Sequence, residues 1–123
     1  MQGTAKAFFG LSVLSAIIGM AWGIQMSASG DHLLSPAHAH LNLIGYVGFA
    51  IFATYYHLVP AAGETMLAKI HLAIAVVAVV LMVPGIVMAI RETGDMLAKL
   101  GSVAAIVSML LFGWIFLTSS RTS

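Results

Sequence analysis

Residues 66–90 read MLAKIHLAIAVVAVVLMVPGIVMAI, an apolar run in which Lys69 is the only charged side chain. About 20 apolar residues suffice for a helix to cross the hydrocarbon core of a bilayer, so this run predicts a membrane-spanning helix. Pro84 and Gly85 lie inside it, where we expect them to kink the helix and not to end it, because neighbouring groups satisfy the freed carbonyl. The run therefore points to a membrane protein.

The rest of the chain has the same character. Of its 123 residues, 61% are hydrophobic and 7% are charged, whereas soluble domains carry about 25% charged residues. Three further apolar runs, 7–26, 37–59 and 96–117, predict three more spans. Pro36 and Pro60 bracket the second span, and the short turn after Pro60 predicts an antiparallel hairpin with the third. The expected fold is all-α: one domain over residues 1–123, forming a four-helix bundle in the lipid bilayer.

The charged residues give the expected orientation. Lys6, Lys69 and Arg121 lie on the side of the termini, and Arg91 and Lys99 lie on the other side. This excess favours both termini in the cytoplasm of a bacterial inner membrane. An alternative is that the first apolar run is a signal peptide cleaved near residues 27–29, but at about twenty residues the run is longer than the usual apolar region of such a peptide.

Composition also excludes several functions. The chain has no cysteine, which excludes disulfides, thiolate metal sites and redox-active thiols, and its net charge of +1 provides no basic surface for nucleic acid. No nucleophile elbow, phosphate-binding loop or dinucleotide motif is present, so hydrolysis and phosphoryl transfer have no candidate residues.

The histidines are the most informative residues. Of five, His38, His40, His57 and His71 fall within or at the ends of predicted spans, where ionisable groups are costly and mark a pathway, a ligand site or a buried pair. The alternative is that each lies half solvated at the membrane interface. His57 and His71 flank one turn and are positioned to pair with each other or with Glu64. Asp31 and His32 in the outer loop are weaker metal-ligand candidates.

His38 and His40 open the second span two residues apart. On a helix such residues point about 200° from each other, so they cannot bind one metal ion together but can each bind a different centre. Imidazole suits haem iron or copper. Gly45, Gly48 and Phe52 follow His38 along one stripe and predict a shallow groove that fits a porphyrin. The alternative for this stripe is a close contact between helices.

These residues also carry a resemblance. HAHLNLIGY (38–46), YYHLVP (55–60) and HL (71–72) occur in the order found in helices ten and eleven of the catalytic subunit of haem–copper oxidases, and they resemble the C-family most closely. The resemblance implies that His38 is the ligand of a high-spin haem and that His40 is the ligand of a low-spin haem on the opposite face. It also implies that Arg91 contacts haem propionates, although an interfacial arginine is the alternative.

The chain departs from that family in its number of spans. The oxidase subunit has about twelve, arranged as three arcs of four, and its copper ligands lie on helices that this chain does not contain. The resemblance therefore implies a single arc, and the missing copper ligands argue against oxygen reduction at a haem–copper pair. A homotrimer would rebuild the ring, with haem held by His38 of one copy and His40 of the next.

The expected function is haem b binding with electron transfer to or from a partner, or binding or reduction of a small gas if the iron keeps an open position. Whether the protein is an enzyme stays open. The alternative is a copper- or zinc-binding sensor or transfer module that uses Asp31, His32, His38 and His40. A third interpretation is a structural assembly factor in which the histidines bind nothing.

Overall fold

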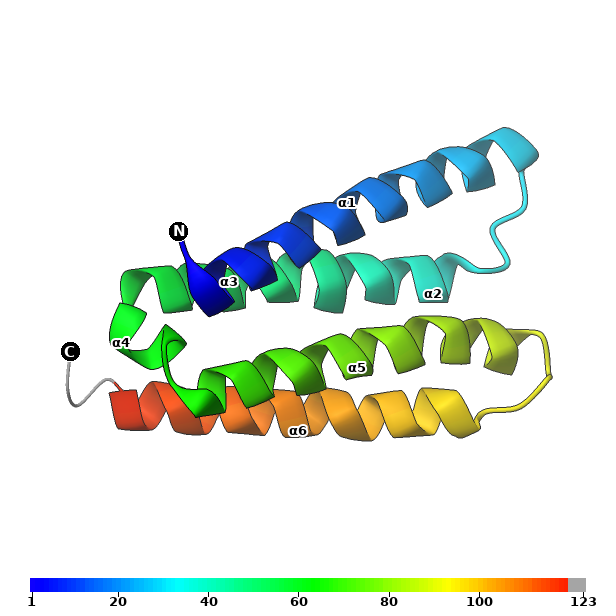
Figure 1. Cartoon of the computed structure of the whole chain (residues 1–123). Helices are drawn as coiled ribbons and strands as arrows, with labels where there is room; N and C mark the ends of the chain where they lie inside the picture. Colours follow the sequence, from blue (N-terminus) through cyan, green and yellow to red (C-terminus); the bar gives the residue numbers. More distant parts are fainter. Residues whose placement is uncertain (120–123) are drawn as a thin grey trace.

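The computed structural model describes residues 1–119, which form four long helical spans and contain no strand. Each span is long and apolar enough to cross a membrane, which confirms the predicted four-helix membrane bundle. The first, third and fourth spans are single helices, and the second consists of three consecutive segments (Figure 1). The elements are α1 (Gly3–Ser29), α2 (Ser35–His40), η1 (Leu41–Val47), α3 (Gly48–Leu58), α4 (Pro60–Gly63), α5 (Met66–Ile90) and α6 (Met96–Ser119). Arg121, used above for the orientation, lies outside the described residues.

Local sequence signals explain the helix ends. After α1, Gly30 adopts a left-handed φ of 71° and its N–H donates to the carbonyl of Met26 at 3.0 Å, a common helix C-cap. At the start of α5, the Thr65 hydroxyl accepts the Ala68 N–H at 3.2 Å. Within α5 the helix continues through Pro84, so this proline does not end it.

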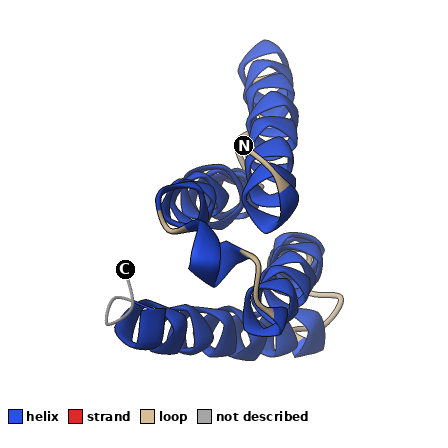
Figure 2. Ribbon diagram, turned by 60° about the vertical axis from the view of Figure 1, so that its left-hand side comes forward, coloured by secondary structure: helices blue, strands red, loops and turns tan. Residues whose placement is uncertain are grey.

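The four spans form two hairpins. In one, α1 packs along the second span; in the other, α5 packs along α6 (Figures 1 and 2). The hairpins meet where α5 contacts α2, and the short α4 contacts α6. Between α5 and α6 the backbones approach closely at Gly85, where a Cβ would lie 2.4 Å from the backbone N of Ala98, and at Gly101, where it would lie 2.7 Å from that of Met82. Small residues at such contacts permit close packing of membrane helices.

The middle of the second span is a π-helix, which the sequence analysis did not predict. Residues Leu41–Val47 form η1 between α2 and α3, with no break in the chain direction. Ser12 of α1 donates a hydrogen bond to the Tyr46 carbonyl at 2.7 Å, so α1 holds this segment through a polar contact between spans. A π-helix closes i→i+5 hydrogen bonds and often marks functional positions in longer helices. Residues that would share one face of a regular α-helix therefore do not stay on one face across η1.

An aromatic cluster joins all four spans at the end near α4. It consists of Phe8 from α1, Phe52 and Tyr56 from α3, His71 from α5 and Phe112 from α6. The ring centres of Phe52 lie 4.5 Å from His71 and 4.7 Å from Phe112. Phe8, Tyr56 and His71 are almost completely buried and are among the largest fully buried side chains, so this cluster belongs to the core.

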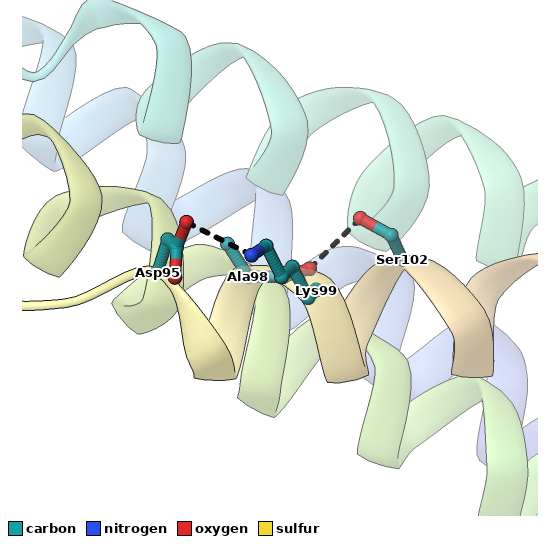
Figure 3. A network of polar contacts seen from close by, with 4 residues as sticks. All are labelled: Asp95, Ala98, Lys99 and Ser102. Atoms are coloured by element: carbon teal, nitrogen blue, oxygen red, sulfur yellow. Dashed lines mark hydrogen bonds and ion pairs between the residues drawn. The ribbon is translucent and has the colours of Figure 1, made fainter.

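The opposite end of α6 is polar and exposed. Lys99 forms an ion pair with Asp95 at 3.2 Å, and Ser102 donates to the carbonyl of Ala98 at 2.8 Å (Figure 3). Both charged side chains are about two-thirds exposed, so the pair contributes little to stability. Its position is consistent with α6 emerging from the hydrocarbon region there.

Candidate functional site

His38 lies in the contact between α2 and α1. Its Nε2 is 2.8 Å from the Gly19 carbonyl oxygen, to which it donates, and its ring stands edge-on to Trp22 with the ring centres 5.9 Å apart. A Cβ at Gly23 would lie 3.3 Å from the same nitrogen, so the imidazole lies against the two glycines of a Gly19-x-x-x-Gly23 motif. His38 therefore joins α2 to α1 through Nε2, the ring nitrogen that would otherwise be available to bind a metal.

Asn42 reinforces this contact one turn further along. Its amide Nδ2 donates to the His38 carbonyl at 3.0 Å. Its Oδ1 lies so close to Gly19 that a Cβ there would be 2.5 Å away. Any larger residue at position 19 would displace Asn42. The close approach of Asn42 and His38 therefore explains why α1 carries a glycine here.

His40 hydrogen-bonds within its own helix, through the other ring nitrogen. Its Nδ1 lies 2.7 Å from the Pro36 carbonyl oxygen of its own helix, which accepts the Nδ1 proton. This hydrogen bond leaves Nε2 as the unprotonated nitrogen, and Nε2 has no hydrogen bond within residues 1–119. A metal-binding histidine typically donates its other ring N–H to a backbone carbonyl in this way, which fixes the tautomer and raises the basicity of the ligating nitrogen. His40 alone among the candidates has this geometry.

The expected porphyrin groove below His38 is wrong. A Cβ at Gly45 would lie 2.8 Å from the Ser15 hydroxyl oxygen of α1, so α1 already covers this glycine. Gly48 faces the Leu43 carbonyl of its own span, and Phe52 belongs to the aromatic cluster. At Gly45 the stripe is therefore a close contact between helices, which was the alternative interpretation.

The weaker metal-ligand candidates are not brought together. Asp31 and His32 are exposed in the loop between the first two spans, where Asp31 accepts the Leu33 N–H at 3.0 Å. Within residues 1–119, no group of three or more histidine and carboxylate side chains is placed to hold one metal ion. The end of α5 lies at the end of the bundle where α2 begins (Figure 1). Arg91 directly follows α5, is exposed and makes no ion pair in the described chain.

His71 has a partner that the sequence analysis did not identify. The Tyr56 hydroxyl lies 2.8 Å from its Nδ1, in the aromatic cluster, and its fully buried Nε2 has no hydrogen-bond partner in the structure. His57 is exposed, and no contact pairs it with His71 or Glu64 among the described residues. The sequence did hold a signal for this pair, because Tyr56 and His71 lie at similar numbers of residues before and after the turn that joins the second span to α5.

Comparison with known proteins gives no relative. No protein-family model, no curated protein and no solved structure matches the chain. Any statement about function therefore depends on the geometry of the residues described above. That geometry distinguishes two histidines of the second span: His38 hydrogen-bonds to α1, and His40 has a ring nitrogen without a hydrogen bond in the described chain.

Proposed function

We propose that this integral membrane protein binds haem b through His40 and transfers electrons. The observation that carries the proposal is the 2.7 Å contact between the His40 Nδ1 and the Pro36 carbonyl, which leaves Nε2 as a ligating nitrogen. The two histidines also differ in their partners, since His38 hydrogen-bonds to α1 and the hydrogen bond of His40 is to its own helix.

The surface of the second span suits a flat apolar ligand. A shallow groove of about 540 Å³ runs along η1 and α3, and its lining is mostly apolar with two tyrosines: Tyr46, Val47, Ala50, Ile51, Thr54, Tyr55 and Leu58. Apolar surroundings of this kind favour macrocycle binding and influence the potential of a haem. When bound, haem supplies one-electron chemistry. Arg91, at the end of α5 near α2, is available to pair with a propionate.

The proposal rests on His40 and not on His38. For His38 to ligate haem from a neighbouring copy in a homotrimer, its Nε2 would first have to leave the Gly19 carbonyl. In the single chain His38 instead positions α2 against α1. The copper or zinc alternative has less support, because residues 1–119 offer no cluster of three ligands.

The test is an absorbance spectrum of the protein purified in mild detergent from cells supplied with haem precursor, oxidised and then reduced with dithionite. The wild-type protein is expected to show an intense Soret band that is lost in His40→Ala. His57→Ala is the matched control, because His57 is also in the second span but is exposed at its other end.

Two results would contradict the proposal. One is a colourless wild-type protein, and the other is a His40→Ala variant with the full Soret band and unchanged reduced spectrum. His38→Ala is expected to retain the band per folded protein while lowering thermal stability, because it removes the contact with Gly19. The mass of the haem-loaded particle gives the number of copies.

A further inference from the structure

His71 has one ring nitrogen for which the described chain provides no partner. The side chain is fully buried, the Tyr56 hydroxyl lies 2.8 Å from its Nδ1, and its Nε2 makes no hydrogen bond. Most buried polar groups in folded proteins are hydrogen-bonded, so an exception of this kind indicates strain or a function. His71 has no part in the proposed haem site, whose ligand His40 lies towards the other end of the second span.

The side chains that contact His71 are aromatic and uncharged. Its ring centre lies 4.5 Å from that of Phe52 on α3, 5.1 Å from that of Phe8 on α1 and 5.3 Å from that of Phe112 on α6. Tyr56 is the only titratable side chain among these contacts. An imidazolium in this position would lose its hydration without gaining an anionic partner.

Water can come close to His71 although the side chain is buried. His71 is the sixth residue of α5, about 8 Å along the helix from its start. A cavity of about 510 Å³ lies at this end of the bundle. The residues with titratable groups in its lining are Met1, Tyr56, His57, Glu64 and Lys69. Of these, only Tyr56 bonds to His71 within residues 1–119, so one side chain separates the cavity from the imidazole.

The aromatic cluster connects the two hairpins at this end. The Cα atoms of α3 all lie more than 8 Å from those of α5 and α6, so side chains fill the space between these helices. Phe52 and Tyr56 of α3 reach across it to His71 of α5 and Phe112 of α6. Towards the other end the hairpins meet where α2 contacts α5 (Figure 1). A change at His71 therefore acts directly on the contact between the hairpins.

We propose that His71 is a pH-sensitive switch between a closed and an open arrangement of the two hairpins. Neutral His71 stays in the aromatic cluster, bonded to Tyr56. A proton taken up from water in the cavity leaves an N–H on both ring nitrogens, and Nε2 has no acceptor in the cluster. Aromatic faces attract a cation less strongly than water solvates it, so the imidazolium is more stable once the hairpins separate here and water enters. Acid therefore favours the open arrangement, as protonated histidines do at the interfaces of other pH sensors.

The experiment measures the distance between the hairpins in the full chain, reconstituted in lipid nanodiscs. Because the chain has no cysteine, spin labels can be attached at Val13→Cys on α1 and Leu110→Cys on α6, both exposed positions, and their separation measured by double electron–electron resonance. Spectra are recorded at about pH 8 and about pH 5, on either side of the ordinary histidine pKa of about 6.5. We expect longer distances at the lower pH. A second labelled pair, Val80→Cys and Val103→Cys, lies within one hairpin and should not change.

Variants assign the change to His71. His71→Phe keeps an aromatic ring in the cluster and His71→Gln keeps a polar partner for Tyr56; neither titrates, so both should stay closed at the lower pH. His57→Gln is the matched control, because His57 is exposed next to Tyr56, and it should respond as the wild-type protein does.

Three results would overturn the proposal. The first is an unchanged distance between the hairpins in the wild-type protein, and the second is the same lengthening in either His71 variant or its loss in His57→Gln. The third is a loss of helical circular dichroism at the lower pH, which would show unfolding of the spans and not their separation. None of these results depends on haem, so the proposed function is tested separately.

Discussion

The contact between α5 and α6 provides a sharp test of the packing, through the substitution Gly85→Ala. The added Cβ would lie 2.4 Å from the backbone N of Ala98 and 2.7 Å from the backbone carbon of Leu97. Both neighbours are main-chain atoms of a helix, so no side-chain rotation relieves the overlap. The two helices would have to separate by about 1 Å to reach ordinary contact, and overpacking of this kind costs about 1–3 kcal/mol.

Gly113→Ala is the matched control, because it makes the same change on α6 at a position with no atom within 4 Å of the new Cβ. Alanine is a better helix former than glycine by about 1 kcal/mol, so this variant is expected to be stabilised by up to that amount. The difference between the two variants therefore isolates the helix contact, and we expect it to be about 1–3 kcal/mol.

The assay is reversible unfolding in mixed micelles with increasing dodecyl sulfate, followed by far-ultraviolet circular dichroism. Gly85→Ala should unfold at a lower, and Gly113→Ala at an equal or higher, dodecyl sulfate fraction than the wild-type protein. Equal shifts in both variants would refute the close backbone approach at Gly85, because only the intrinsic helix preference would then be measured.

Three further predictions concern other parts of the bundle. Tyr56→Phe leaves both buried ring nitrogens of His71 without a partner and is expected to lower the free energy of unfolding by about 1–3 kcal/mol. The double variant Tyr56→Phe with His71→Phe should recover most of this loss. A double variant that recovers none of it would contradict the pairing. Asp95→Asn breaks the exposed pair with Lys99 and should change the stability by less than about 0.5 kcal/mol in the same unfolding assay. Because the chain has no cysteine, Asp95→Cys and Ala61→Cys can be labelled one at a time in intact cells with an impermeant maleimide: cytoplasmic termini predict that only the first is labelled, and the reverse pattern would invert the orientation.

Hydropathy was sufficient to predict the spans. The run at 66–90 coincides with α5, and the other three spans differ from their predicted limits by at most four residues, because long apolar runs bounded by proline, glycine and charged residues leave few alternatives. Spacing was sufficient to place His38 and His40 on different sides of one helix, since they lie in an α-helical turn before η1.

The contacts between spans could not be predicted in the same way. The hydrogen bond from the His38 imidazole to Gly19 was not predicted, although two glycines on α1 leave room for the ring beside a backbone carbonyl. Which face of α1 meets the second span is decided by packing between residues far apart in sequence. Tyr56 was likewise read only as part of a motif, although its hydroxyl satisfies His71.

The π segment Leu41–Val47 sets how the later part of the second span is turned about the helix axis. A π-turn holds about one residue more than an α-turn, so the same residues wound as a continuous α-helix would turn further by about 100°, the angle of one residue in an α-helix. The part after residue 47 would then be rotated by that angle relative to His38 and His40, and side chains that now face α1 would turn away from it. The extra residue held by the π-turn therefore sets how the histidine end of the second span is aligned with its aromatic end.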